Sequence, residues 1–129
     1  MSRVQSREEL FKLIFEFCLT GEKNDFSLET VINENENLDE EYIKRVYNGI
    51  VENYKQLEEE ISKYAKGFSV ERIFKVDLAL LYLALYEIKF IKEIPNVVSV
   101  NEVLNLAKTY STEKSASYIN GVLSNFVKK

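Results

Sequence analysis

Histidine and tryptophan are absent from this chain of 129 residues, and cysteine, methionine and proline occur once each. Without histidine the chain lacks the commonest general base and the commonest metal ligand. Cys18 alone cannot form an internal disulfide, and without a histidine it completes neither a zinc site nor a Cys–His nucleophile. We therefore expect a core thiol at Cys18, no enzyme activity, and no metal or cofactor.

Helix-breaking residues are also scarce, because the single proline is accompanied by only four glycines. The glycines stand alone at positions 21, 49, 67 and 121, so they form no glycine-rich phosphate loop. Apolar residues recur at steps of three and four, and no segment alternates as a strand does. These patterns predict an all-α fold of about seven helices in one domain, with two packed sub-bundles over residues 1–66 and 67–129.

Only one stretch is hydrophobic over a long distance, VDLALLYLALYEIKFI at residues 76–91. It is too short to cross a bilayer and it carries Asp77, Glu87 and Lys89, so it predicts a helix buried on nearly every side. The residues expected in the middle of the second sub-bundle are Leu80, Leu81, Ala84 and Leu85. The N-terminus has no apolar signal-peptide core, and we expect a cytoplasmic protein without membrane contact.

The net charge of −4 argues against nonspecific coating of nucleic acid, but the charge is unevenly distributed. Residues 1–65 hold 8 basic and 15 acidic side chains, whereas residues 66–129 hold 9 and 6. The first seven residues carry only basic charges, at Arg3 and Arg7. The asymmetry is compatible with a local surface for an anionic ligand.

Capping residues predict where the helices begin and end. Ser6 starts a capping box, so the first helix is expected over residues 7–19, and Gly21 ends it. Asp39 is expected to cap a long third helix that Gly67 ends. The other predicted helices cover residues 28–34 (capped by Ser27), 76–91 (after a short turn capped by Ser69), 100–110 (capped by Ser99) and 113–127.

The dipeptide Asn120-Gly121 falls in the middle of the last predicted helix, where glycine costs about 1 kcal/mol relative to alanine. Asn120 shares a helical face with Ala116 and Leu123, so its amide is expected to point at least partly inward and to bond across helices. Gly121 is expected to let a neighbouring helix approach closely.

Three segments resemble, in order and over residues 61–123, the family of the bacterial transcription antitermination factor NusB. They are ISKYAKGFSVERI, VDLALLYLALYEI and IPNVVSVNEVLNLAKTYSTEKSASYINGVL. The first half is similar through its helix pattern and through Arg7-Glu8. Two positions depart from the family pattern, because Tyr82 replaces a usual arginine and Phe68 a usual tryptophan.

The resemblance implies a non-catalytic helical protein that binds the boxA element of nascent ribosomal RNA transcripts. It implies that NusE, a small-subunit ribosomal protein, binds RNA with it in the antitermination complex of RNA polymerase. In the family an arginine-rich N-terminal segment contacts RNA, and Arg3 and Arg7 stand in that segment here. Asp77 and Glu87 are the expected contacts to the protein partner.

Further RNA contacts are expected around the last helix, since single-stranded RNA is bound by aromatic rings and cations. Tyr64 and Tyr118 are candidates for stacking on bases, with a half-buried core position as the alternative for each. The candidate polar contacts are Lys63, Lys66, Lys114, Ser115 and Asn120. For each lysine the alternative is an ordinary solvated surface charge.

Three other hypotheses stay open. The chain could be a protein-interaction adaptor that binds NusE with little RNA affinity of its own, which the few N-terminal arginines favour. It could be related to the helical domain that precedes ribosomal RNA cytosine methyltransferases, although no cofactor-binding domain is expected in these 129 residues. It could also be an independent helical scaffold.

Overall fold

The computed structural model of the chain describes residues 2–65 and 70–127. Over these ranges the chain forms six α-helices and one short 3₁₀ helix, without strands, which confirms the all-α prediction. The elements are α1 (Arg3–Thr20), α2 (Asp25–Glu34), α3 (Glu40–Ser62), η1 (Val70–Arg72), α4 (Lys75–Phe90), α5 (Asn96–Tyr110) and α6 (Glu113–Leu123). The seventh predicted helix corresponds to η1.

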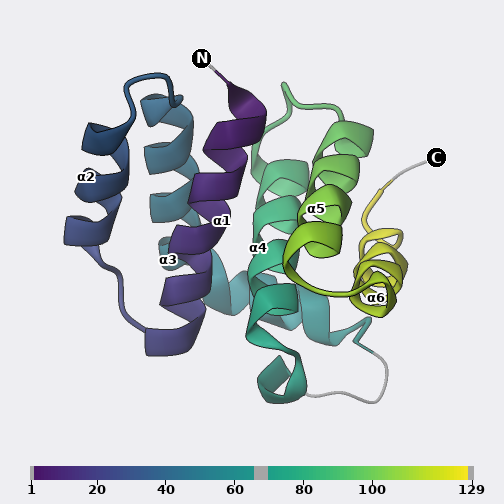
Figure 1. The fold of residues 1–129 in the computed structure, drawn as a ribbon. Coiled ribbons are helices and arrows are strands. Elements are labelled where there is room, and N and C mark those ends of the chain that lie inside the picture. Colours follow the sequence, from purple (N-terminus) through teal and green to yellow (C-terminus); the bar gives the residue numbers. More distant parts are fainter. Residues whose placement is uncertain (1, 66–69, 128–129) are drawn as a thin grey trace.

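The centre of the fold is α4, which packs against α1, α3, α5 and α6 (Figure 1). The leucine-rich sequence of α4 explains this position, because a helix that is apolar on every side must be covered on every side. Leu80, Leu81, Ala84 and Leu85 are fully buried, as predicted. No helix among the described residues has the length and apolar character needed to cross a membrane.

Helix α1 begins one turn earlier than the sequence pattern indicated. Ser2 is its N-cap, and the Ser2 hydroxyl accepts a hydrogen bond from the backbone N–H of Gln5 at 3.1 Å. Ser6, the predicted cap, is instead buried within the helix, where its hydroxyl accepts the backbone N–H of Asp39 at 2.7 Å. The prediction was wrong because a second serine four residues upstream can cap the same helix.

Two other predicted caps are also wrong. Asn24 caps α2 and its side-chain oxygen accepts the N–H of Ser27, so Ser27 lies inside the helix. Helix α5 begins directly after Pro95, which places Ser99 in its first turn and in the interior. The caps at Gly21, which has a φ of 76°, and at Asp39 are confirmed.

The C-terminal ends of two helices also differ from the prediction. Helix α3 ends at Ser62, and α6 ends at Leu123 rather than at residue 127. Gly67 and Ser69, expected to end α3 and to cap a turn, lie outside the described residues, as does the predicted boundary at 66/67.

Close helix packing occurs at a glycine other than the expected one. A Cβ atom at Gly121 would meet nothing within 4 Å, and Asn120 is exposed, so the expected inward packing of this pair is wrong. A Cβ atom at Gly49 in α3 would overlap the Tyr86 hydroxyl of α4. Gly49 therefore makes room for a tyrosine ring at the α3–α4 contact.

Candidate functional site

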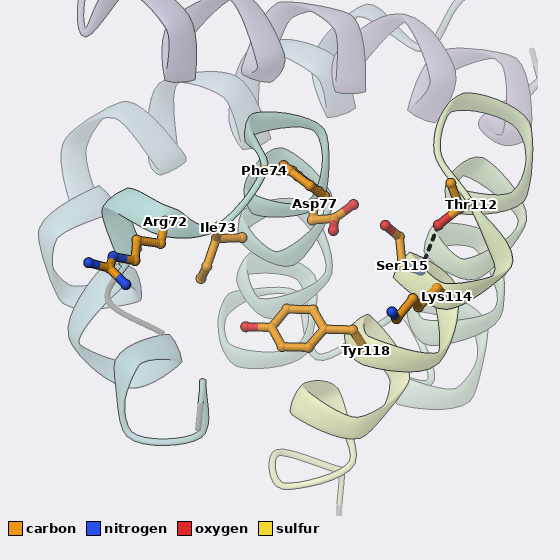
Figure 2. Close-up of a pocket in the computed structure, with 8 residues that line it drawn as sticks. All are labelled: Arg72, Ile73, Phe74, Asp77, Thr112, Lys114, Ser115 and Tyr118. Atoms are coloured by element: carbon orange, nitrogen blue, oxygen red, sulfur yellow. Dashed lines mark hydrogen bonds between the residues drawn. The ribbon is translucent and has the colours of Figure 1, made fainter. Parts of the chain in front are cut away.

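A pocket of about 340 Å³ opens between the start of α4 and the start of α6 (Figure 2). Four of the residues expected to bind RNA or a partner meet here, although they come from two separate helices. The pocket is lined by Arg72, Ile73, Phe74, Asp77, Thr112, Lys114, Ser115 and Tyr118. Of these, Asp77, Lys114, Ser115 and Tyr118 were singled out from the sequence.

The first turns of α6 give the pocket one wall. The Thr112 hydroxyl caps α6 by accepting the backbone N–H of Ser115 at 3.0 Å. Because residues three and four apart lie on one side of a helix, Lys114, Ser115 and Tyr118 all reach the same pocket. The cap thus fixes where the wall begins.

Asp77 supplies a carboxyl group inside this pocket. Its side chain is 4% exposed, and its Oδ1 accepts a hydrogen bond from the Ser111 hydroxyl at 3.2 Å. The Ser115 hydroxyl points towards the carboxyl group from α6 (Figure 2). Burial raises the pKa of Asp77 above its usual value, and the two serines oppose this shift. The hydrogen bond from Ser111 thus links the start of α4 to the turn after α5.

Two aromatic side chains line the pocket from different elements. Phe74, which precedes α4, is 73% exposed, an unusual position for a large apolar ring. The ring of Tyr118 lies half-buried below Asp77 and extends towards Ile73 (Figure 2). Burial, together with the charge of Asp77, raises the pKa of the Tyr118 hydroxyl, so this side chain stays neutral.

Cationic side chains stand on opposite sides of the pocket. Arg72 and Lys114 are both exposed and lie on either side of Asp77 and Tyr118 in Figure 2. Neither has an acidic salt-bridge partner within residues 2–65 and 70–127. Arg72 and Phe74 were missed in the sequence, where VERIF indicated only a short turn. The signal was a basic and an aromatic residue in the loop that precedes a buried helix.

The remaining surface candidates lie outside the lining of this pocket. Lys63 is exposed and sits 3.7 Å from Glu60. The ring of Tyr64 packs edge-on against Phe126 with 5.1 Å between ring centroids, so it has the half-buried core position weighed as its alternative. Asn120 is exposed on α6. Lys66 lies outside the described residues.

Arg7 and Glu87, both expected as contact residues, form a buried ion pair instead. Arg7 is 2% exposed and donates from Nε and Nη2 to the two carboxylate oxygens of Glu87, at 2.9 and 3.0 Å. The hydroxyls of Tyr42 and Ser99 also donate to Glu87. Direct contact of either charge with RNA or a partner is therefore corrected to a structural role, because neither reaches the surface.

Arg7 keeps its positive charge in this environment. Burial alone would lower the pKa of Arg7, but the hydrogen bond to Glu87 and nearby negative charges outweigh it and raise that pKa. The four connected side chains come from α1, α3, α4 and α5, so the network ties four helices together at one point. A buried charge is tolerated when it is paired and fully hydrogen-bonded in this way.

Arg3 is the exposed arginine of the opening segment. Its Nη2 lies 2.9 Å from Oδ2 of Asp39, and its guanidinium lies over the ring of Tyr42 at 4.2 Å from the centroid. Figure 1 places the start of α1 at the opposite end of the molecule from η1 and the start of α4, whose residues line the pocket. Arg3 and the pocket are therefore separate features of the surface.

Cys18 lies partly buried on α1. Burial raises the pKa of its thiol to about 12, and Lys75 opposes this only in part. The thiol is thus protonated and unreactive at neutral pH, in agreement with the expected core thiol.

Comparison with known proteins decides the family. The model of the NusB family matches residues 4–128, nearly the whole chain. The chain belongs to the NusB family. The resemblance seen in the sequence is therefore confirmed, and it extends over the first half as well.

The NusB relatives are similar over their full lengths. A "Transcription antitermination protein NusB" from Clostridium botulinum (strain Hall) is 41% identical over 143 residues, with 98% of this chain and 100% of that protein covered. A protein of the same name from Clostridium acetobutylicum is 41% identical over 129 residues, with 98% and 96% covered. The similarity thus runs nearly from end to end of both proteins.

Two solved structures agree with the fold. T. maritima NusB superimposes with a TM-score of 0.86 at 33% identity, covering 100% of this chain and 92% of that one. A NusB chain in a crystal structure of NusB and NusE with double-stranded RNA superimposes with a TM-score of 0.83 at 26% identity. That match covers 98% of this chain and 97% of the other.

Proposed function

We propose that this chain is a transcription antitermination factor that binds boxA RNA of nascent ribosomal RNA transcripts together with NusE. Its relatives carry the name of antitermination proteins, and one structural neighbour was solved with NusE and RNA. The chain acts as a non-catalytic adaptor in the antitermination complex of RNA polymerase, in the cytoplasm where bacterial transcription takes place.

The observation that carries the proposal is the pocket between α4 and α6. Its volume of about 340 Å³ lies at the lower end of the range of about 300–1,000 Å³ for ligand pockets, a size suited to one nucleotide. Phe74 and Tyr118 offer rings for stacking, and unpaired bases of single-stranded RNA stack on such rings. Arg72 and Lys114 supply positive charge for the phosphates beside that base.

One observation favours the adaptor with little RNA affinity. Arg7 is buried and Arg3 is engaged by Asp39, so the opening segment offers few free cations to RNA. In that case NusE would bind the chain with similar affinity whether or not RNA is present. The acidic first half fits this alternative, because it repels a polyanion.

Fluorescence anisotropy with a labelled boxA RNA, with and without NusE, tests the proposal. Binding by this chain that tightens when NusE is added supports it. Tyr118→Ala should weaken RNA binding, since base stacking is worth about 1–3 kcal/mol. Phe26→Ala, which removes an 81% exposed ring from α2, is the matched control and should have no effect.

The result that overturns the proposal is equally specific. If boxA RNA binds no better than a scrambled RNA with NusE present, and Tyr118→Ala changes nothing, the RNA-binding function fails.

A duplex RNA serves as competitor, because the RNA in the neighbouring structure is double-stranded. A duplex does not present an unstacked base, so it should compete poorly.

A further inference from the structure

We infer that the pocket between α4 and α6 selects guanine, with the Asp77 carboxylate accepting hydrogen bonds from the guanine ring N1–H and the exocyclic amino group. This inference rests on the proposed RNA-binding function and adds the base that the pocket takes. It assigns Asp77 to RNA recognition rather than to contact with the protein partner.

Asp77 has acceptor capacity to spare. An ionised carboxylate has two oxygens with about four lone-pair sites, and it can only accept hydrogen bonds. Ser111, in the turn between α5 and α6, uses one of these sites, and the Ser115 hydroxyl points towards the carboxylate from α6. Asp77 also lines the cavity itself, so its remaining sites are available to a ligand that brings donors.

Guanine is the base whose edge matches such a group. Its Watson–Crick edge carries two adjacent donors, the ring N1–H and the amino group, which a carboxylate can accept as a charge-assisted pair. Adenine and cytosine place one amino group beside an acceptor nitrogen, and uracil places one N–H between two carbonyl oxygens. Each of these would bring an acceptor against the carboxylate of Asp77.

The charged side chains of the pocket are arranged as a guanine nucleotide requires, with an acceptor inside and cations outside. Asp77 is buried at 4% exposure, whereas the cations Arg72 and Lys114 are exposed on either side of it. A carboxylate inside a site for a polyanion weakens binding unless it meets hydrogen-bond donors. A guanine held between Phe74 and Tyr118 would direct its donor edge to Asp77 and leave its phosphates near the cations.

The competing explanation is that Asp77 only fastens the start of α4 to the α5–α6 turn through Ser111. That role needs the hydrogen bond from Ser111 and nothing more. It predicts lower stability for an Asp77 variant but no change in the ranking of bases. Base preference is therefore the measurement that separates the two.

The test uses labelled 13-residue oligouridines that carry guanosine, inosine, adenosine or cytidine at the central position, titrated by anisotropy with NusE present. The guanosine RNA should bind roughly 5- to 100-fold more tightly than the all-uridine RNA. Inosine lacks only the exocyclic amino group, so it should lose most of this advantage. Asp77→Asn should bring the ratio of guanosine to uridine affinity close to one, and Asp25→Asn on α2 should leave it unchanged.

The outcomes distinguish this inference from the function on which it rests. If none of the RNAs, boxA included, binds, the proposed function fails. If all five oligonucleotides bind equally, or if Asp77→Asn keeps the guanosine preference, only the guanine inference is overturned. Circular dichroism would reveal whether Asp77→Asn fails to fold. In that case the comparison of inosine with guanosine RNA on the unaltered chain still tests the inference, and equal affinities for the two would overturn it.

Discussion

Arg7 and Glu87 lie 80 positions apart in the sequence and meet in a two-point ion pair inside the protein, with N–O distances of 2.9 and 3.0 Å. The pair joins α1 to α4, and Tyr42 and Ser99 complete the hydrogen bonds of the carboxylate. A charge in this position must be matched, because an unpaired ion in the interior loses its hydration without compensation.

Removing one partner of this pair should therefore destabilise the protein strongly. We expect Arg7→Met to lower the free energy of unfolding by about 3–5 kcal/mol, because Glu87 would be left buried and unpaired. Urea unfolding followed by circular dichroism measures this change. Arg3→Met is the matched control, since the exposed Arg3–Asp39 pair should contribute about 1 kcal/mol or less. Equal effects of the two variants would contradict the structural role of Arg7.

The two helical glycines Gly49 and Gly121 should respond in opposite ways to the same substitution. Gly49→Ala places a methyl group against the Tyr86 hydroxyl and should destabilise by roughly 1–3 kcal/mol. Gly121→Ala enters open space on α6 and should stabilise by up to about 1 kcal/mol, because alanine has the higher helix propensity. Thermal melts of both variants measure the two changes in stability. Melting temperatures that shift in the same direction would contradict the expected opposite effects.

Asp77 should give the stability a distinct pH dependence. Burial raises its pKa in the folded protein above the ordinary value of 3.8. A carboxyl group whose pKa is raised by folding stabilises below its unfolded pKa, and this contribution is lost as the pH rises through the folded pKa. Between pH values of about 4 and 7, the unaltered chain should therefore lose stability relative to Asp77→Asn. A constant difference in melting temperature between the unaltered chain and Asp77→Asn across this range would contradict the raised pKa of Asp77.

Salt dependence should separate the cations of the pocket from its rings. Single-strand binding loses about 0.7 log unit of affinity per log unit of salt for each phosphate contact, so Arg72→Ala and Lys114→Ala should each lower the slope by up to that amount. Tyr118→Ala should weaken binding about equally at all salt concentrations, because stacking releases no counterions.

Anisotropy titrations over a salt series with NusE present measure these slopes. Lys44→Ala is the control, since Lys44 lies within 4 Å of Glu29 and Glu40 and outside the lining of the pocket. A slope that falls as much for Lys44→Ala as for Arg72→Ala would show that general charge, not the pocket, holds the phosphates.

The core could be predicted from the sequence because its signal is local. The run around Leu80 and Leu81 is apolar at every helical position, and only a buried helix can have such a sequence. The helix starts were harder to predict from the sequence, because Ser2 and Ser6 can both cap a helix. What decided between them was the distant backbone N–H of Asp39, which bonds to Ser6 in the folded chain.

The site was predictable only in part, for a related reason. Lys114, Ser115 and Tyr118 share one helix face, so their proximity follows from spacing along α6. The exposure of Arg72 and Phe74 depends on how a short loop packs across from α6, which no periodic pattern encodes. The burial of Arg7 likewise depends on Glu87, a residue with no local relation to it.

The position of α4 has a consequence for how the protein unfolds. Because α4 contacts α1 and α3 on one side and α5 and α6 on the other, neither half can separate without exposing its leucines. Its backbone amides should therefore exchange with deuterium only through global unfolding, while those at the start of α2 exchange through local fluctuations. The helices packed around α4 would then melt as one cooperative unit, and a single protection level along α4 would report the stability of the whole unit.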